Sequence, residues 1–357
     1  MAPSDRSIDA EPLAKAAAWM QRNLLWLLVA CYLLAGVLPG PGLAIRHLSF
    51  TSQITAPMLL LALLLFCAAV VVQGSQIRHL MQQPGILLLG LIAVWIVPGL
   101  FVSALGQVMP KILDEQATVG MMVGLALVAA MPVANSSVAW CQNAQGNVAI
   151  GLGLIVLTIV LSPVAAPQML QWMGLALSDQ ETAQCERLVT RFSGMFFIIW
   201  VILPSLAGMV VHRLAGSARI VRARPGIRIV SAITLLALNY SNASLAMPRI
   251  FNGESPSTLL SSALLAAALS ALGVASASVL SLLLRLGRTT RISLVFGFSM
   301  KHTGLALVLA GEVLQNEPRA ILMIVLATLL QHIVAGTVDW YLMHSANRNR
   351  SQQAPTP

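Results

Sequence analysis

A single lysine, Lys301, lies near the middle of an apolar stretch that is long enough to cross a membrane. The stretch runs from about Ile292 to Val313, so Lys301 is roughly 14 Å from either end of a helix that rises ~1.5 Å per residue. That depth is too great for its side chain to reach the headgroups. A central charge costs at least about 2.5–3.5 kcal/mol to insert, so it normally faces a cavity or a partner. We therefore predict a functional site at Lys301; the alternative is a lysine merely paired inside a helix bundle.

The neighbours of Lys301 also carry hydrogen-bonding groups. The run Ser299-Met300-Lys301-His302-Thr303-Gly304 interrupts the apolar stretch. His302 either titrates near neutral pH or is an interior histidine held by hydrogen bonds. A positive group beside a solute favours anions. His302 and Thr303 are therefore candidate substrate-binding residues.

A second polar cluster interrupts another apolar stretch. Pro132 breaks the backbone hydrogen bonding of its helix, and Asn135, Ser136 and Ser137 follow within about one turn. These three residues are further candidates for substrate binding. Proline alone is a weak signal in such stretches, which also contain Pro98, Pro163, Pro167 and Pro204.

The composition fixes the class of protein. Hydrophobic residues make up 57% of the 357 positions and charged residues only 9%, which predicts an all-α polytopic membrane protein in a lipid bilayer. The net charge of +9 comes from basic residues scattered in short loops, a pattern that fits a membrane topology and not a nucleic-acid partner. The four cysteines have no metal-ligand spacing. We expect neither a cofactor nor a metal.

Ten apolar windows have the length of a transmembrane helix. They lie near residues 24–45, 54–73, 85–106, 117–140, 147–171, 192–211, 229–247, 258–284, 292–313 and 320–343. With the N-terminus in the cytoplasm, 14 of the 21 basic residues fall in cytoplasmic segments. The six in external loops are Arg46, Lys111, Arg187, Arg191, Arg249 and Arg319. This asymmetry predicts that both termini are cytoplasmic, in a bacterial inner (plasma) membrane.

The longest polar connection divides the chain into two halves of five helices. An odd number of helices per half inverts the second half in the membrane, as in many secondary transporters. The interrupted helices four and nine then correspond, and paired interruptions point to a binding site at the midplane. The predicted segments are a cytoplasmic N-terminal segment (1–22), a first repeat (23–171), an external linker (172–191), a second repeat (192–345) and a cytoplasmic tail (346–357).

These motifs resemble those of the bile acid:sodium symporter (BASS) superfamily over most of residues 24–345. The resemblance is strongest in the runs Met131–Ser137, Gly146–Ala149 and Met300–Ala306. It implies that helices four and nine are discontinuous and cross each other. It also implies a core of helices three to five and eight to ten, a panel of helices one, two, six and seven, and a substrate cavity between them.

The chain departs from this family at the positions that the resemblance assigns to sodium. Gly297 stands at an acidic position, Lys301 at a glutamine and His302 at an asparagine. Four further ligand positions hold apolar residues, namely Val138, Gly151, Ile155 and Ala93. Because sodium needs several oxygen ligands, we predict that the sodium sites are lost and that no metal binds.

A buried ammonium at position 301 offers one positive charge and three donors to the carbonyl ends of the broken helices. Lys301 is thus predicted to substitute for the cation or to couple transport to protons. Helix seven is polar as well, and the resemblance places it beside the cavity. Its Asn239 and Asn242 either contact substrate or form helix–helix hydrogen bonds.

The leading hypothesis is therefore a secondary transporter of a small organic anion by BASS-like alternating access, without sodium. One alternative is a sodium-independent or proton-coupled carrier of a neutral metabolite. Another is a membrane sensor that has the same fold and does not transport. An intramembrane enzyme is not expected, because the sequence contains no H-E-x-x-H, no G-x-S-x-G and no intramembrane aspartate pair.

Overall fold

A computed structural model describes residues 10–51, 54–71, 84–112, 115–192, 197–253 and 255–352. The predicted segments 1–22 and 346–357 lie partly outside these ranges. Of the described helices, six are long and apolar enough to cross a membrane, or seven if one bent pair counts as a single span. Many apolar side chains point outward, among them Trp26 at 70% and Leu203 at 58% exposure, as expected of a lipid-facing surface. The prediction of an all-α polytopic membrane protein is confirmed.

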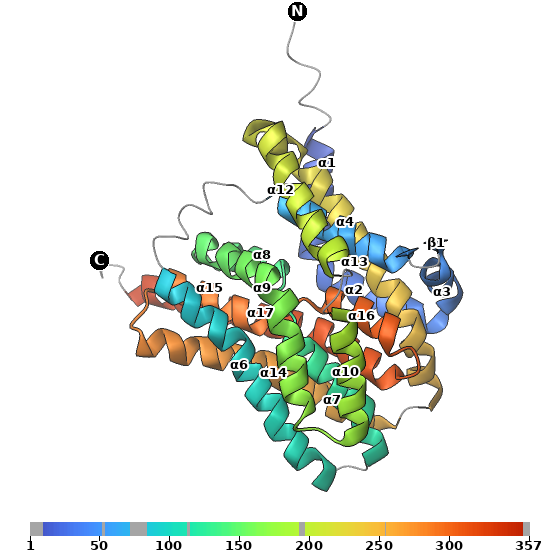
Figure 1. Cartoon of the computed structure of the whole chain (residues 1–357). Helices are drawn as coiled ribbons and strands as arrows, with labels where there is room; N and C mark the ends of the chain where they lie inside the picture. Colours follow the sequence, from blue (N-terminus) through green and yellow to red (C-terminus); the bar gives the residue numbers. More distant parts are fainter. Residues whose placement is uncertain are drawn as a thin grey trace, which may run out of the picture.

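One group of helices contains the predicted spans one, two, six and seven. Within this group, α13 packs against α1, α2, α3, α4 and α12, and α12 packs against α4. Figure 1 shows α1, α4 and α12 together in the upper part of the view. The bounds are α1 (Ala10–Arg22), α2 (Leu24–Val37), α3 (Pro39–His47), α4 (Ala56–Val70), the π-helical turn η2 (Ile198–Ile202), α12 (Leu203–Ala215) and α13 (Ser217–Gly253).

The first predicted span, 24–45, is not one continuous helix in the structure. α2 ends at Val37 and α3 begins at Pro39, since the proline has no backbone N–H to continue the ladder and favours a first helical position. Before it, α1 meets α2 at a bend of 70°. After it, β1 (Ser49–Thr51) and β2 (Ile54–Thr55) pair as a small antiparallel hairpin that leads into α4.

A second group of helices contains the other predicted spans. Here α6 packs against α7, α9 and α14, while α17 packs against α7, α14 and α16. Figure 1 shows α6, α7 and α14 in the lower part of the view. The bounds are α6 (Pro84–Val108), the 3₁₀ turn η1 (Met109–Lys111), α7 (Glu115–Ala130), α8 (Ser136–Asn143), α9 (Val148–Gly174), α14 (Pro256–Leu283), α15 (Arg288–Ser299), α16 (Thr303–Val313) and α17 (Pro318–Gln352).

The segment predicted as a linker, 172–191, is largely helical. α10 (Asp179–Phe192) packs against α9, α7 and α16. Its buried side chains include Glu181, Cys185 and Leu188, which follow one another at three- and four-residue steps. This spacing places them on one face of a helix. The polar connection between the halves is thus an amphipathic helix that packs against α7, α9 and α16.

Two glycines bring helices of the second group into backbone contact. A Cβ atom on Gly273 of α14 would lie 2.5 Å from the carbonyl oxygen of Phe298 and 2.7 Å from the Cα atom of Ser299. A Cβ atom on Gly124 of α7 would lie 2.6 Å from the carbonyl oxygen of Ala320 in α17. Close approach of this kind is how small residues stabilise helix pairs in membranes. These two contacts hold α15 and α7, whose ends form the site described next, against their neighbouring helices.

Candidate functional site

The two predicted interruptions meet each other. α7 ends at Ala130 and α8 begins at Ser136, while α15 ends at Ser299 and α16 begins at Thr303. Between these ends, the two non-helical segments lie side by side as an antiparallel bridge, with Val133 opposite Lys301. We call the segments 131–135 and 300–302 the crossover.

Backbone hydrogen bonds hold the crossover together. The Ala134 N–H donates to the Met300 carbonyl at 3.0 Å, and the His302 N–H donates to the Pro132 carbonyl at 2.9 Å. Pro132 cannot donate a backbone hydrogen bond, so the chain leaves the helix there. The freed groups must find partners inside the bundle, because lipid offers none. Each interrupted segment thus accepts a hydrogen bond from a backbone N–H of the other.

Carbonyl groups at the end of α7 are satisfied from outside the helix. The last four carbonyls of a helix have no partner within it. The indole Nε1–H of Trp95 in α6 donates to the Ala130 carbonyl at 3.0 Å. The ammonium of Lys301 contacts the next carbonyl, that of Met131, at 3.4 Å. α6 and α15–α16 therefore cap α7 together.

Lys301 is 3% exposed, and its ammonium binds a second carbonyl that the sequence analysis did not anticipate. Its Nζ atom lies 2.5 Å from the carbonyl oxygen of Val94 in α6. In an unbroken helix this oxygen would accept from the N–H of residue 98, but residue 98 is proline. Pro98 thus leaves a free carbonyl beside the crossover, and Lys301 occupies it. Three segments of the chain therefore contribute to the site, namely the two parts of the crossover and α6.

Carbonyl dipoles stabilise the charge of Lys301 without neutralising it. Within the described residues its Nζ contacts carbonyl groups, its backbone N–H donates to an amide oxygen, and its carbonyl accepts from the Thr303 N–H. The sequence runs 131–137 and 297–304 contain no aspartate or glutamate. Carbonyl oxygens that their own helix leaves unpaired carry partial negative charge and stabilise a cation, whether just past a helix end, as at Met131, or beside an internal proline, as at Val94. The ammonium therefore sits where a bound cation would be stabilised.

His302 and Thr303 follow Lys301 in the chain, and both are buried at 5% and 4% exposure. The Nδ1 atom of His302 accepts from the Leu305 N–H at 3.1 Å and so caps α16. Gln331 of α17 links the neighbours: its Oε1 accepts from the Lys301 N–H at 2.9 Å, and its Nε2 donates to the Thr303 hydroxyl at 3.4 Å. The sequence analysis did not place Gln331 at the site.

The polar residues after Pro132 lie at the start of α8. Asn135 and Ser136 are half-buried, and Ser137 is 2% exposed. In the part of the chain that the structure describes, the Ser137 hydroxyl has no hydrogen-bond partner, and neither has that of Ser299 at the end of α15. Buried hydroxyl groups without a partner are costly and call for an explanation such as a ligand.

Thr158 of α9 is a further crossover residue that the sequence analysis missed. Its hydroxyl accepts from the Val133 N–H at 3.1 Å and donates to the Leu154 carbonyl at 2.7 Å. The family resemblance directed attention to Gly151 and Ile155 in this helix. A threonine one turn further along supplies the hydroxyl that the crossover uses.

Asn239 and Asn242 lie on α13, in the other group of helices, and the structure does not bring them to the crossover. The Oδ1 atom of Asn239 accepts from the Tyr32 hydroxyl at 2.6 Å, and its Nδ2 donates to the Leu235 carbonyl at 2.8 Å. The Oδ1 atom of Asn242 accepts from Arg46 at 2.7 Å. Both amides form helix–helix hydrogen bonds, the alternative role that the sequence left open.

Arg46 corrects one expectation from the sequence. Its place at the end of the first predicted span indicated an external loop, but its side chain is 7% exposed, between α3, α13 and α16. Its Nη2 donates to the Gly311 carbonyl near the end of α16. A glycine at 311 permits this, because a Cβ atom there would lie 2.5 Å from Nη1 of Arg46. The molecule thus contains a second buried cation.

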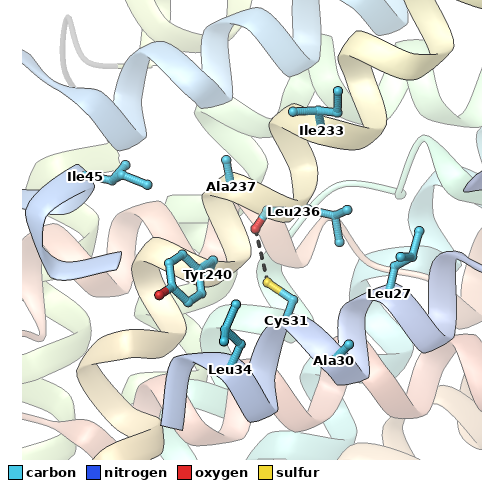
Figure 2. A pocket seen from close by; sticks show the side chains of 9 residues that line it. All are labelled: Leu27, Ala30, Cys31, Leu34, Ile45, Ile233, Leu236, Ala237 and Tyr240. Carbon is cyan, nitrogen blue, oxygen red and sulfur yellow. Dashed lines mark hydrogen bonds between the residues drawn. The ribbon is translucent and has the colours of Figure 1, made fainter. Parts of the chain in front are cut away.

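An open apolar groove of about 380 Å³ lies between α2, α3 and α13. Figure 2 shows its lining side chains, among which the Cys31 thiol donates to the Leu236 carbonyl at 3.3 Å. The groove contains none of the predicted site residues. Among the residues described, no group of three or more His, Cys, Asp or Glu side chains could hold a metal ion.

Comparison with protein families gives a match to a transporter family. The model of the SBF-like CPA transporter family matches residues 22–347, nearly the whole chain. No curated protein sequence matches. The resemblance to the bile acid:sodium symporter group is confirmed by this match.

Proposed function

Because the chain belongs to the SBF-like CPA transporter family, we infer that it is a membrane transporter of a small-molecule solute. We propose that it is a secondary transporter of a small organic anion and that it works without sodium. In this proposal Lys301 replaces the bound cation. The observation that carries it is the position of the Lys301 ammonium, 2.5 Å from the Val94 carbonyl and 3.4 Å from the Met131 carbonyl. A cation at this point stabilises the crossover by compensating the carbonyl dipoles.

The loss of the sodium sites is supported by what surrounds their expected positions. A Cβ atom on Gly297 would lie 3.0 Å from Cδ1 of Leu154, and one on Gly151 would lie 3.6 Å from Cγ2 of Val138. A side chain at 297 would meet an apolar carbon closely, whereas one at 151 would make ordinary contact, so apolar neighbours surround both positions. Sodium, a hard cation, gains nothing from such neighbours.

An anionic solute is supported by the electrostatics of the crossover. Both α8 and α16 begin there, so their N-termini direct partial positive charge toward it. Lys301 adds a full charge, and the buried hydroxyl groups of Ser137 and Ser299 have no partner within the described residues. Anion binding at the start of broken helices is a general device of transporters.

We also propose ten spans arranged as two inverted repeats, with domains 23–171 and 192–345 and both termini cytoplasmic. Each of the ten predicted windows falls on a helix or on a pair of helices separated by a short break, which supports this count. α13 packs most extensively against α2, α3 and α4 of its own group and less against α16 and α17 of the other, which supports a panel that moves against a core. Cysteine accessibility from the two sides of the membrane, at residues 178 and 345, tests the topology.

The function is tested by binding and uptake with purified protein in liposomes. The probes are small carboxylates, each paired with its neutral amide. We expect carboxylates to be favoured and their affinity to stay unchanged when choline replaces sodium at equal ionic strength. A steep, saturable dependence on sodium contradicts the cation replacement. Preferred uptake of the amides indicates a neutral solute, and the absence of any uptake indicates a sensor.

Lys301 variants test the role of the lysine itself. Lys301→Ala leaves the carbonyls of Val94 and Met131 uncompensated, so binding and stability should both fall. Lys301→Gln restores the residue of the resembled family but no charge, and should rescue little unless Gly297→Glu is added. Lys111→Ala, which removes an exposed lysine, is the matched control. Wild-type behaviour of Lys301→Ala would show that the lysine is incidental.

A further inference from the structure

Arg46 lies where the two groups of helices meet. It belongs to α3 in the first group, and its two hydrogen-bond partners come from different groups. Asn242 of α13 accepts from Nη1 at 2.7 Å, and the Gly311 carbonyl of α16 accepts from Nη2. A charged side chain at 7% exposure inside a membrane protein is a candidate for a functional role.

Both hydrogen-bond partners of Arg46 are neutral. The carboxylate of Glu312 acts on it electrostatically, but both oxygens of Glu312 are engaged elsewhere. Its Oε1 accepts from the Thr55 hydroxyl at 3.1 Å, and its Oε2 lies 3.8 Å from Nη2 of Arg191. A guanidinium has five N–H donors and suits a carboxylate with two parallel hydrogen bonds. Such charge-assisted bonds are about twice as strong as those to neutral acceptors.

The contact with Gly311 is the one that motion would break. Arg46 and Asn242 belong to α3 and α13, which pack together extensively, whereas Gly311 belongs to α16, which packs less against α13. If the groups separate, the guanidinium keeps Asn242 and loses the Gly311 carbonyl. Lys301 differs in this respect, because its acceptors, Val94 and Met131, lie in the same group as Lys301 itself.

We infer that Arg46 binds the anionic group of the solute, and that the Gly311 carbonyl takes the place of this group when no solute is present. The inference rests on the proposed function and names the residue that recognises the charge. Lys301 then holds the crossover together, and Arg46 is the cation that exchanges partners. The ligand class is a carboxylate, or an oxyanion of the same planar, two-oxygen geometry, attached to a small organic body.

The experiment measures the unfolding temperature of the purified full-length chain during titration with sodium benzoate. Benzamide, which has the same shape without the charge, is the matched ligand, and sodium chloride maintains the ionic strength. We expect benzoate to raise the unfolding temperature in a saturable manner and benzamide to do so weakly or not at all. A ligand that binds only the folded state stabilises it by mass action.

Variants of Arg46 test the assignment. Arg46→Gln should abolish the benzoate response, and Arg46→Lys, which keeps the charge but not the fork, should weaken the affinity by about tenfold or more. Arg191→Gln is the matched control, because it removes a positive charge near the same Glu312 from a side chain that is 43% exposed. It should leave the affinity within about twofold of wild type.

Gly311→Ala distinguishes recognition from a purely structural role. The added methyl group would lie 2.5 Å from Nη1 and 2.8 Å from Oδ1 of Asn242, so it displaces the guanidinium from the carbonyl. If the carbonyl competes with the solute, this variant unfolds at a lower temperature yet binds benzoate more tightly. If Arg46 is merely structural, the variant loses stability and gains no affinity.

The outcomes separate this inference from the proposed function. Benzoate stabilisation that survives Arg46→Gln overturns the assignment of Arg46, and carboxylate uptake in the same variant leaves the anion transporter intact. An equal response to benzamide, or none to benzoate in wild type, overturns the inference. Loss of folding in Arg46→Gln would not hide the result, because Arg46→Lys and Gly311→Ala make their own predictions.

Discussion

The ammonium nitrogen of Lys301 lies 2.5 Å from the carbonyl oxygen of Val94, an oxygen that its own helix cannot use. The amide that would bond to it belongs to residue 98, which is proline. The proline in α6 thus frees an acceptor for the ammonium of Lys301, which lies between α15 and α16, 207 residues away from Val94 along the chain. The lysine and the proline form a structural pair that neither position reveals alone.

Replacing Pro98 by alanine should expose this pairing. Removing a proline from a helix interior stabilises the helix by about 3 kcal/mol. In wild type this gain is reduced, because the new N–H of residue 98 competes with Lys301 for the Val94 carbonyl. We expect Pro98→Ala to stabilise the Lys301→Met variant by about 1–2 kcal/mol more than it stabilises wild type. A double-mutant cycle on the free energy of unfolding in mixed micelles measures the difference.

Pro163→Ala in α9 is the control for this cycle. Pro163 also frees the carbonyl four residues earlier, that of Ile159, but the hydroxyl of Ser162 occupies it at 2.8 Å. Pro163→Ala and Lys301→Met should therefore be additive within about 0.5 kcal/mol. Additivity of Pro98→Ala with Lys301→Met would contradict the proposed link between Val94 and Lys301.

The sequence could predict the two interruptions because their signals are local, whereas their crossing was implied by the family resemblance. A proline followed by polar residues, and a lysine in the middle of an apolar stretch, each conflict with a continuous span, so Lys301, His302 and the segment after Pro132 were identified. The contribution of Val94 was not predictable in this way. Pro98 looks like any other proline in a span until the fold places a donor beside the carbonyl that it frees.

Arg46 shows a second reason why part of the site was missed. A basic residue after an apolar window indicates a loop at the membrane surface. Here Pro39 starts a separate short helix, α3, which carries Arg46 back among α13 and α16. The burial depends on a tertiary contact with Gly311, a position whose only sequence signal is the missing side chain. Local patterns contain no information on that contact.

Gly273 should tolerate no side chain. In Gly273→Ala the methyl group would lie 2.5 Å from the Phe298 carbonyl oxygen and 2.7 Å from the Ser299 Cα atom, and backbone atoms cannot move aside as a flexible side chain can. We expect a loss of about 1–3 kcal/mol in the free energy of unfolding. Gly226→Ala in α13 meets nothing within 4 Å and should be neutral or stabilising by up to about 1 kcal/mol. Equal effects would contradict the close approach of α14 to α15.

Thr158 should be essential for the backbone of the crossover. Thr158→Val keeps the size of the side chain but leaves the Val133 N–H without its acceptor. A buried donor left unpaired costs about 1–3 kcal/mol, and we expect the free energy of unfolding to fall by that amount. Thr158→Ser retains the hydroxyl and should stay within about 1 kcal/mol of wild type. A stable Thr158→Val variant would show that Val133 has another partner in the membrane.

His302 should act as a helix cap and not as a proton carrier. Its Nδ1 lone pair accepts from the Leu305 N–H at 3.1 Å, and an imidazolium has no lone pair left for this bond. His302→Ala should therefore cost about 0.5–2 kcal/mol in the free energy of unfolding, whereas His302→Asn, another good capping residue, should cost little. Benzoate titrations between about pH 5.5 and 8.5, a range that brackets the usual titration of histidine, complete the test. If His302→Asn keeps the pH dependence of wild type, the histidine is structural. If that variant loses the dependence while it stays folded, His302 carries the proton and the capping role is secondary.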